Sequence, residues 1–343
     1  MDPDSTSGVA VVGRGGVIVA ERAAGMADRD LGLPCTPETR FQIASVSKHF
    51  TAAAVLLLAS QSQLSLQDPV SRWFDGCPRE WQAITLHHLL THTSGLAHLD
   101  GLPALDLYRP IDPAQELSIF QREPLLFAPG SRYRYSSPGY TLLAWIVEKT
   151  SGQPYASFLG DGIFAPLGMA TASAGDPPGG TGMARGYDAG EPVPSFDLAT
   201  IGIGAGDVWC TAADLLRWDE AIASGELLPA GLLEAMLTPH ALTGSAGRRE
   251  GWSFTGYGYG WQIGTMAGRR AYFHTGDNSG YVAVNAWLPD EQIALAIVAN
   301  DQATDILQIA ADLLERSTAH TPVPGRRETA GLNGAIVSPE RDT

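Results

Sequence analysis

The chain has 343 residues, of which 44% are hydrophobic and 17% are charged, a balance typical of a globular protein with a sizeable core. This length suits one large domain or two closely joined domains. The net charge of −15 disfavours nucleic acid and anionic membrane surfaces as partners, because both would repel the protein.

The beginning of the chain, residues 1–4, is acidic and lacks the pattern of a signal peptide. The longest apolar run, 52–59, is too short to cross a bilayer. We therefore expect a cytoplasmic protein without a membrane partner. The three cysteines, Cys35, Cys77 and Cys210, form no C-x-x-C pair, so we expect free thiols and neither a metal site nor a redox pair.

The first part of the chain predicts one hairpin followed by helices. The β-type runs 8–12 and 17–20 flank an Arg-Gly-Gly sequence, which predicts a hairpin. The alanine- and leucine-rich stretch from Ser45 to about Ser60 predicts a helix. Further helices are expected over 86–91, 140–150, 154–159 and 211–224.

Strands return toward the end of the chain. The β-type runs 258–263, 270–274, 281–287 and 293–299 predict a meander, and 305–316 predicts a closing helix. This order predicts an α/β (α+β) fold, with an antiparallel sheet built from both termini, flanking helices and an inserted, mostly helical domain. The expected ranges are 8–60 and 255–318 for the sheet domain, 61–254 for the insertion and 319–343 for a C-terminal tail.

One lysine stands where it could activate a serine. The chain has only two lysines, Lys48 and Lys149, and Lys48 follows Ser45 by three residues at the start of the apolar helix. Residues i and i+3 share a helix face, so the Lys48 amine can reach the Ser45 hydroxyl. Burial would lower the pKa of this lysine and let it take the serine proton. A serine N-cap beside a surface lysine fits the same spacing.

Two further motifs carry groups suited to the same chemistry. Tyr135 stands before a Pro-Gly sequence that is expected to form a turn, which would place the phenol on a rigid loop, although a loop tyrosine packed by its ring fits as well. His274-Thr275-Gly276 ends a predicted strand, where a glycine would let the backbone approach a ligand. The edge of that strand could pair with an extended substrate, and a simple turn is the alternative.

Together and in this order, the motifs around Ser45, Tyr135 and His274 resemble those of the serine β-lactamase and penicillin-binding-protein superfamily. The branch most resembled contains class C β-lactamases, D-alanyl-D-alanine carboxypeptidases, D-amino-acid amidases and β-lactamase-like esterases. Sequence patterns that are usual in this branch also occur at 41–44, 89–96, 211–215 and 257–261.

The resemblance implies acyl transfer through a Ser45 acyl-enzyme, with no cofactor and no metal. Lys48 and Tyr135 would accept the serine proton and pass it to the leaving group. The backbone N–H groups of Ser45 and Asp277 would form the oxyanion hole. The residues implied in substrate binding are Ser137, His274, Thr275 and Gly276.

The chain departs from the family pattern at three places. Ser137 replaces the usual asparagine and lacks its amide, which suggests a shifted substrate class. His274 replaces a frequent lysine and could be neutral or charged near pH 7, so substrate binding could depend on pH. The helix that precedes the first strand in most relatives is expected to be missing or replaced.

We therefore expect a serine hydrolase that cleaves an ester or a D-configured amide of a small molecule or short peptide. An acyltransferase in small-molecule metabolism is the alternative, and a sensor or binding protein with weakened turnover is the alternative of another class. A Ser-His-Asp hydrolase is disfavoured because no G-x-S-x-G occurs. A metal enzyme is disfavoured because His88 and His92 belong to no H-E-x-x-H motif.

Overall fold

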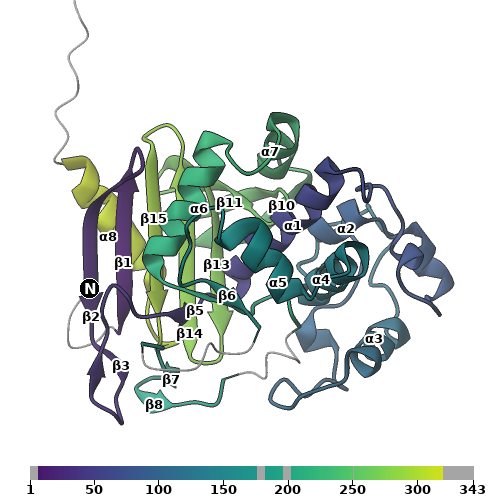
Figure 1. Ribbon diagram of the computed structural model, residues 1–343, viewed down its shortest axis with the longest axis horizontal. Helices are drawn as coiled ribbons and strands as arrows, with labels where there is room; N and C mark the ends of the chain where they lie inside the picture. The colour runs from purple at the N-terminus through teal and green to yellow at the C-terminus, as the bar shows by residue number, and fades with distance from the viewer. Residues whose placement is uncertain (1–6, 176–181, 196–201, 250, 320–343) are drawn as a thin grey trace, which may run out of the picture.

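A computed structural model describes residues 7–175, 182–195, 202–249 and 251–319. An eight-stranded antiparallel sheet runs through it in the order β10-β11-β12-β13-β14-β15-β1-β2 (Figure 1). Its strands are β1 (Gly8–Arg14), β2 (Val17–Ala24), β10 (Ala241–Arg249), β11 (Trp252–Tyr257), β12 (Gln262–Met266), β13 (Arg269–Asn278), β14 (Tyr281–Leu288) and β15 (Ile293–Ala299). The expected α/β fold with a sheet built from both ends of the chain is confirmed.

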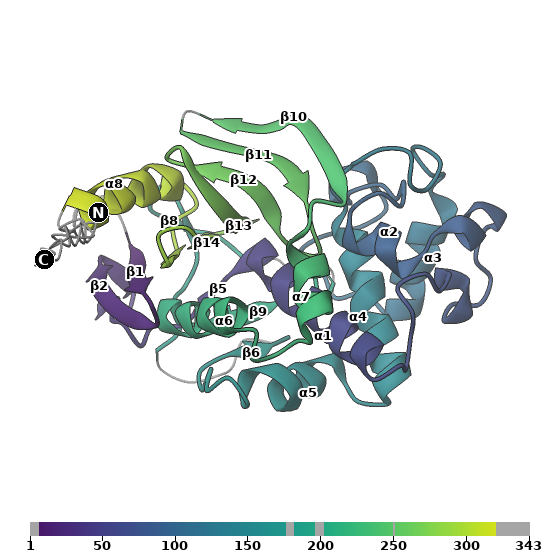
Figure 2. The same ribbon diagram turned by 90° about the horizontal axis from the view of Figure 1, so that it is seen from above.

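Helices lie on both faces of this sheet, as the view from above shows (Figure 2). The α-helices of the described residues are α1 (Lys48–Ser60), α2 (Leu86–Leu90), α3 (Pro113–Arg122), α4 (Ser137–Ser151), α5 (Tyr155–Leu159), α6 (Ala212–Ser224), α7 (Ala230–Leu237) and α8 (Ile306–Ala319). Short 3-10 and π helices cover Ala44–Ser47, Val70–Arg72, Arg79–Ala83, Leu99–Gly101 and Gly160–Phe164. The remaining short strands are β3 (Met26–Asp28), β4 (Leu33–Pro34), β5 (Phe41–Gln42), β6 (Ser173–Ala174), β7 (Tyr187–Asp188), β8 (Glu191–Pro192) and β9 (Val208–Cys210).

Strand β1 joins the two ends of the chain and separates two hydrophobic cores. It pairs with β15 from Gly8↔Ala299 to Arg14↔Ile293, and with β2 on its other side. Its side chains alternate between the faces of the sheet. Val9 and Val11 enter the core that also contains α1 and α4, whereas Ala10 and Val12 enter the core beneath α8.

Helix α8 covers the outer face of the sheet because its apolar residues repeat every four positions. Ile306, Ala310 and Leu314 are buried against the sheet, and this spacing places them on one side of a helix. On the opposite face of the sheet, α1 is buried on nearly every side and packs against α4. The segment around Ser45, which is expected to be catalytic, therefore leads into a helix that the rest of the fold encloses.

The predicted strand 258–263 is displaced. Strand β12 begins only at Gln262, and the residues before it turn back from β11. Gly260 has a φ of +81°, and a Cβ there would lie 2.8 Å from the Lys48 carbonyl oxygen. The alternating aromatic and glycine residues of 257–261 resemble the pattern of a strand, but they form a tight turn that packs against α1.

The paired strands extend into the range expected for the helical insertion. Strand β10 and the first half of β11 lie within 61–254, yet both strands pair with the large sheet. Their pairing assigns β10 and β11 to the sheet. The division of the chain into a sheet domain and an inserted helical domain stays a prediction. From residue 320 onward, the predicted tail falls outside the described residues.

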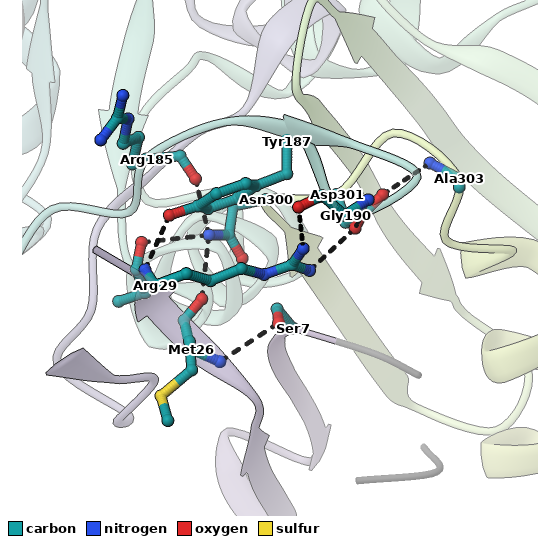
Figure 3. A network of polar contacts seen from close by, with 10 residues as sticks. Ser7, Met26, Arg29, Arg185, Tyr187, Gly190, Asn300, Asp301 and Ala303 are labelled. Carbon is teal, nitrogen blue, oxygen red and sulfur yellow. Dashed lines mark hydrogen bonds and ion pairs between the residues drawn. The ribbon is translucent and has the colours of Figure 1, made fainter. Parts of the chain in front are cut away.

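A polar network ties the segment that carries β7 and β8 to the sheet (Figure 3). The side chain of Asn300, directly after β15, donates hydrogen bonds to the carbonyl oxygens of Met26, Ala27 and Arg185 at 2.7–3.1 Å. Arg29 forms an ion pair of 3.0 Å with Asp301. Three parts of the chain that are remote in sequence are thereby held at one end of the sheet.

The three cysteines are free thiols, as expected. Cys35 and Cys210 are buried, and Cys77 is half-buried. Within the described ranges, no helix combines the length and the apolar character needed to cross a bilayer.

Candidate active site

Ser45 lies in a 3-10 helix (Ala44–Ser47) that leads directly into α1, and not in the α-helix that the sequence predicted. Lys48 is the first residue of α1. In a 3-10 helix, residues i and i+3 lie above one another, so the expected approach of the two side chains is kept. Ala44, directly before Ser45, is fully buried and has a φ of +48°, a strained conformation for a residue with a Cβ.

The Lys48 side chain is fully buried and points at Ser45. Its Nζ lies 3.0 Å from the Ser45 Oγ, 3.4 Å from the Ser137 Oγ and 2.6 Å from the Ala205 carbonyl oxygen. Burial lowers the pKa of Lys48 to about 7, although the nearby Asp207 carboxylate acts in the opposite direction. An amine with this pKa is partly unprotonated at neutral pH, which is the form that can accept a serine proton.

Tyr135 lies over the same lysine. The Lys48 Nζ is 4.9 Å from the centre of its ring. The phenol oxygen is buried and makes no hydrogen bond of normal geometry to the described residues. Burial raises the pKa of Tyr135, while the Ser45 and Ser137 hydroxyls act to lower it. Tyr135 therefore keeps its proton at neutral pH, and its hydroxyl can donate a hydrogen bond in the site.

The sequence Ser137-Pro138-Gly139 does not form the expected turn. Helix α4 begins at Ser137, with Ser136 in extended conformation before it. Proline is well tolerated in the first turn of a helix, where its missing N–H has no partner to lose. The helix start places the Ser137 hydroxyl beside Lys48.

Two histidines that the sequence interpretation left without a role hold this segment. The Nδ1 of His92 accepts a hydrogen bond from the Ser136 N–H at 3.1 Å, and the Nδ1 of His98 accepts one from the Ser137 N–H at 3.1 Å. Burial lowers the pKa of both rings, to about 4 for His98, so both are neutral and can accept. The His92 ring also lies 4.4 Å from the Tyr135 ring.

The expectation that His274 could be charged near pH 7 is wrong. Its Nδ1 lies 2.6 Å from the Thr275 carbonyl oxygen, and its Nε2 lies 3.0 Å from the Tyr257 hydroxyl. A carbonyl oxygen only accepts, so Nδ1 carries the proton and Nε2 accepts from Tyr257. Burial and the nearby Lys48 lower the pKa of His274 to about 3. The ring is therefore neutral in the physiological range.

His274-Thr275-Gly276 does not end its strand, because β13 continues to Asn278. Strand β12 pairs with β13 only as far as Gln262↔Phe273, whereas β14 pairs with β13 through Asn278. Among the described residues, the stretch from His274 onward therefore pairs with a strand on one side only. A backbone edge of this kind can bind an extended substrate by strand addition.

Gly276 allows two backbone segments of the protein to pack closely. A Cβ at this position would lie 2.3 Å from the Ile43 carbonyl oxygen and 3.0 Å from the Ala44 Cβ. The sequence interpretation assigned the glycine to ligand approach, but it lets β13 lie directly against the segment that precedes Ser45. Gly276 contributes to the site by this close packing.

A cavity of about 760 Å³ opens above these groups, a size typical of small-molecule sites. The predicted site residues on its wall are Ser45, Tyr135, Ser137, His274, Thr275 and Asp277. Apolar side chains, among them Leu99, Leu107 and Phe254, complete the lining. Lys48 lies beneath Ser45, and Gly276 is not part of this wall. In the described ranges no group of three or more His, Cys, Asp or Glu side chains could hold a metal ion.

The chain matches the family model described as Beta-lactamase over residues 2–319. It is 33% identical over 252 residues to "Putative penicillin-binding protein PbpX" of Bacillus subtilis, a match that covers 68% of this chain and 59% of that protein. It is 33% identical over 291 residues to "Esterase EstB" of Burkholderia gladioli, covering 72% of this chain and 73% of the esterase.

The fold is also similar to a solved penicillin-binding protein from Bacillus halodurans. The two structures superimpose with a TM-score of 0.79 at 29% sequence identity, covering 90% of this chain and 96% of the other. These comparisons confirm the resemblance to the serine β-lactamase and penicillin-binding-protein superfamily.

Proposed function

Because the chain belongs to the Beta-lactamase family of serine hydrolases, we propose that it hydrolyses an ester through an acyl-enzyme on Ser45. The observation that carries this proposal is the buried Lys48 amine, whose Nζ lies 3.0 Å from the Ser45 Oγ at the floor of a large cavity. An unprotonated amine at this distance can take the hydroxyl proton as the oxygen attacks.

We propose the following steps, in which the residues take the roles that the family resemblance implies. Lys48 accepts the Ser45 proton, the serine oxygen bonds to the acyl carbon, and the negative charge on the acyl oxygen is held by the N–H groups of Ser45 and Asp277. The alcohol leaves as it takes a proton from Lys48 or Tyr135. A water molecule then attacks the acyl-enzyme, which releases the acid and returns the proton to Ser45.

Two features favour an ester over a substrate with an amide or a carboxylate beside the acyl group. Ser137 lacks the side-chain amide that could bind a substrate amide by two hydrogen bonds. Both nitrogens of the neutral His274 are engaged by Tyr257 and Thr275. The similarity to an esterase supports the same choice.

A D-configured amide would use the same groups, and it is the second substrate to test. Transfer of the acyl group to an alcohol or amine would also begin with the Ser45 acyl-enzyme. Product analysis in the presence of a short alcohol separates hydrolysis from transfer. The expected cytoplasmic location stays a prediction.

The test is intact-mass spectrometry combined with release of p-nitrophenol from p-nitrophenyl acetate. The wild-type protein should form an acetyl adduct and release p-nitrophenol, and Ser45→Ala should do neither while keeping its melting temperature. Lys48→Met should slow acylation by about a hundredfold or more, the scale of a lost general base. Lys149→Met is the matched control, because Lys149 is exposed on α4.

An adduct on Ser45→Ala at the wild-type rate would overturn the assignment of the nucleophile. Equal acylation rates in Lys48→Met and Lys149→Met would overturn the role of Lys48. A stable adduct that forms without turnover would indicate the binding or sensor alternative.

A further inference from the structure

A second cavity of about 530 Å³ lies next to the catalytic cavity, between the outer face of the sheet and the start of α8. Its walls combine the apolar side chains of Trp252, Phe273, Val282, Ile306 and Leu307 with polar side chains that include Gln302, Thr304 and Asp305. Cavities of this size are typical of sites for small organic ligands. None of the groups proposed for the chemistry at Ser45 needs this space.

The two cavities adjoin at a gap in the sheet. They share the lining residues Phe254, Gln262, Thr275 and Asp277, so the two cavities meet at these side chains. Pairing between β12 and β13 stops at Gln262↔Phe273. Beyond this pair, no described strand pairs with β13 on the β12 side, and Thr275 and Asp277 of β13 line both cavities.

Gln262 stands at this junction with an unsatisfied group. It is 7% exposed, and its Oε1 has no hydrogen-bond partner among the described residues. A buried polar atom without a partner costs free energy, and in native proteins such atoms usually meet water or a ligand. The amide can therefore bind a polar group of a molecule that passes from one cavity to the other.

The outer wall of the second cavity is held in place by the network of Figure 3. Asp301 accepts hydrogen bonds from Arg29 at 3.0 Å, from the Gly190 N–H at 3.0 Å and from the Ala303 N–H at 3.2 Å. Ala303 lines the cavity two residues later. A wall anchored in this way is preformed, so an occupant loses little free energy to ordering it.

We propose that the second cavity is a subsite for an apolar part of the substrate, an aliphatic chain or an aromatic ring that extends from the ester at Ser45 past Gln262. The proposal rests on the proposed ester hydrolysis and names its substrate class: esters with a long apolar group. Each methylene that enters such a site should raise kcat/KM by about fourfold.

The test uses two series of esters that lengthen on opposite sides of the scissile bond. The first lengthens the acyl chain, from p-nitrophenyl acetate to p-nitrophenyl decanoate. The second lengthens the alcohol, from ethyl acetate to decyl acetate. In the wild-type protein, kcat/KM should rise over several added methylenes in one series, and that series identifies which side of the ester occupies the subsite.

Leu307→Trp should fill the cavity, and the measured quantity is the ratio of kcat/KM for the longest ester to that for the shortest within each variant. This ratio should fall by at least tenfold in Leu307→Trp. Leu313→Trp is the control, because Leu313 is on the same helix and packs into the same core but lines neither cavity. Its ratio should equal that of the wild-type protein.

A flat dependence on chain length in both wild-type series would overturn the subsite, and so would equal ratios in the wild-type protein and Leu307→Trp. If Leu307→Trp does not fold, Ala303→Trp blocks the same cavity from the exposed loop. Failure of p-nitrophenyl acetate to acylate Ser45 would instead overturn the proposed function, so the two failures are distinguishable.

Discussion

The Tyr257 hydroxyl donates a hydrogen bond of 3.0 Å to the Nε2 of His274, and this bond fixes where the proton of the imidazole is. The proton is on Nδ1, which lies 2.6 Å from the Thr275 carbonyl oxygen. A neutral ring therefore stands on the wall of the catalytic cavity. The charge that remains next to the nucleophile is that of Lys48, and it depends on pH.

The first prediction concerns the pH dependence of kcat/KM. The pKa of Lys48 is lowered to about 7, and the unprotonated amine is the active form, so kcat/KM should rise with pH through about 7 and level off above it. His274, with a pKa of about 3, should add no step in this range. Initial rates with p-nitrophenyl acetate from pH 5 to 9 measure the profile.

Substitution of His274 by glutamine separates the two groups in the pH profile. The step near pH 7 should persist in His274→Gln, because it belongs to Lys48. A profile that falls as the pH rises through 7, or a step that disappears in this variant, would contradict the assignment.

The second prediction concerns carboxylate substrates. His274→Lys would place a cation on the cavity wall, so kcat/KM for an ester that carries a carboxylate should rise about tenfold relative to its neutral analogue. Added salt should reduce this gain. His274→Gln should give no gain, since it adds no charge. A wild-type protein that already prefers the carboxylate ester would contradict the neutral role of His274.

The sequence predicted best the elements whose signals are local. The uninterrupted apolar run 293–299 became β15 without a change of bounds, and 211–224 became α6 with Thr211 as its cap. The sequence interpretation missed α3, although its start carries a local signal. Asp112 caps the helix and Pro113 occupies its first position. Strands β10 and β11 carry glycine, serine and arginine, and only pairing with the rest of the sheet makes them strands.

In the candidate site, too, the contacts with a local sequence signal were predicted and the long-range contacts were not. The approach of Lys48 to Ser45 follows from a three-residue spacing, which any helical turn preserves. The contacts of His92 and His98 with Ser136 and Ser137 join residues about forty positions apart. No periodicity encodes such contacts, and the neutral state of His274 depends on burial that only the folded chain provides.

The third prediction concerns the close packing of Gly276. Gly276→Ala would force a Cβ to within 2.3 Å of the Ile43 carbonyl oxygen. The resulting displacement of β13 from the Ser45 segment should cost about 1–3 kcal/mol of stability, and it should lower kcat/KM. Thermal unfolding and ester hydrolysis measure both effects.

Gly231→Ala is the control for this substitution. Gly231 lies in α7, where a Cβ would contact nothing within 4 Å. This variant should gain about 0.5–1 kcal/mol, because alanine favours a helix over glycine. Equal behaviour of the two variants would contradict the packing role of Gly276.

The fourth prediction concerns the fully buried Asp219. Its Oδ2 accepts a hydrogen bond of 2.7 Å from the Asn285 side chain, and its Oδ1 has no partner among the described residues. Burial raises the pKa of Asp219 well above its usual 3.8, so the folded protein holds a proton that the unfolded chain releases. Its contribution to stability is present below about pH 4 and is lost as the pH rises.

Asp219→Asn should therefore raise the melting temperature more at pH 8 than at pH 4, because an amide needs no proton to be buried. Glu220→Gln, an exposed substitution on the same helix, is the control and should show no such dependence. A larger gain at pH 4 than at pH 8 would contradict the protonated state of Asp219.

The pairing of β1 with β15 sets a delay in the biosynthesis of the protein. Gly8 pairs with Ala299, so β1 leaves the ribosome well before β15 and must wait for it. At typical rates of translation, that interval is roughly 15 to 60 seconds. We expect the nascent hairpin to present an open edge during this time, a state that chaperones protect and that limited proteolysis of stalled chains would detect.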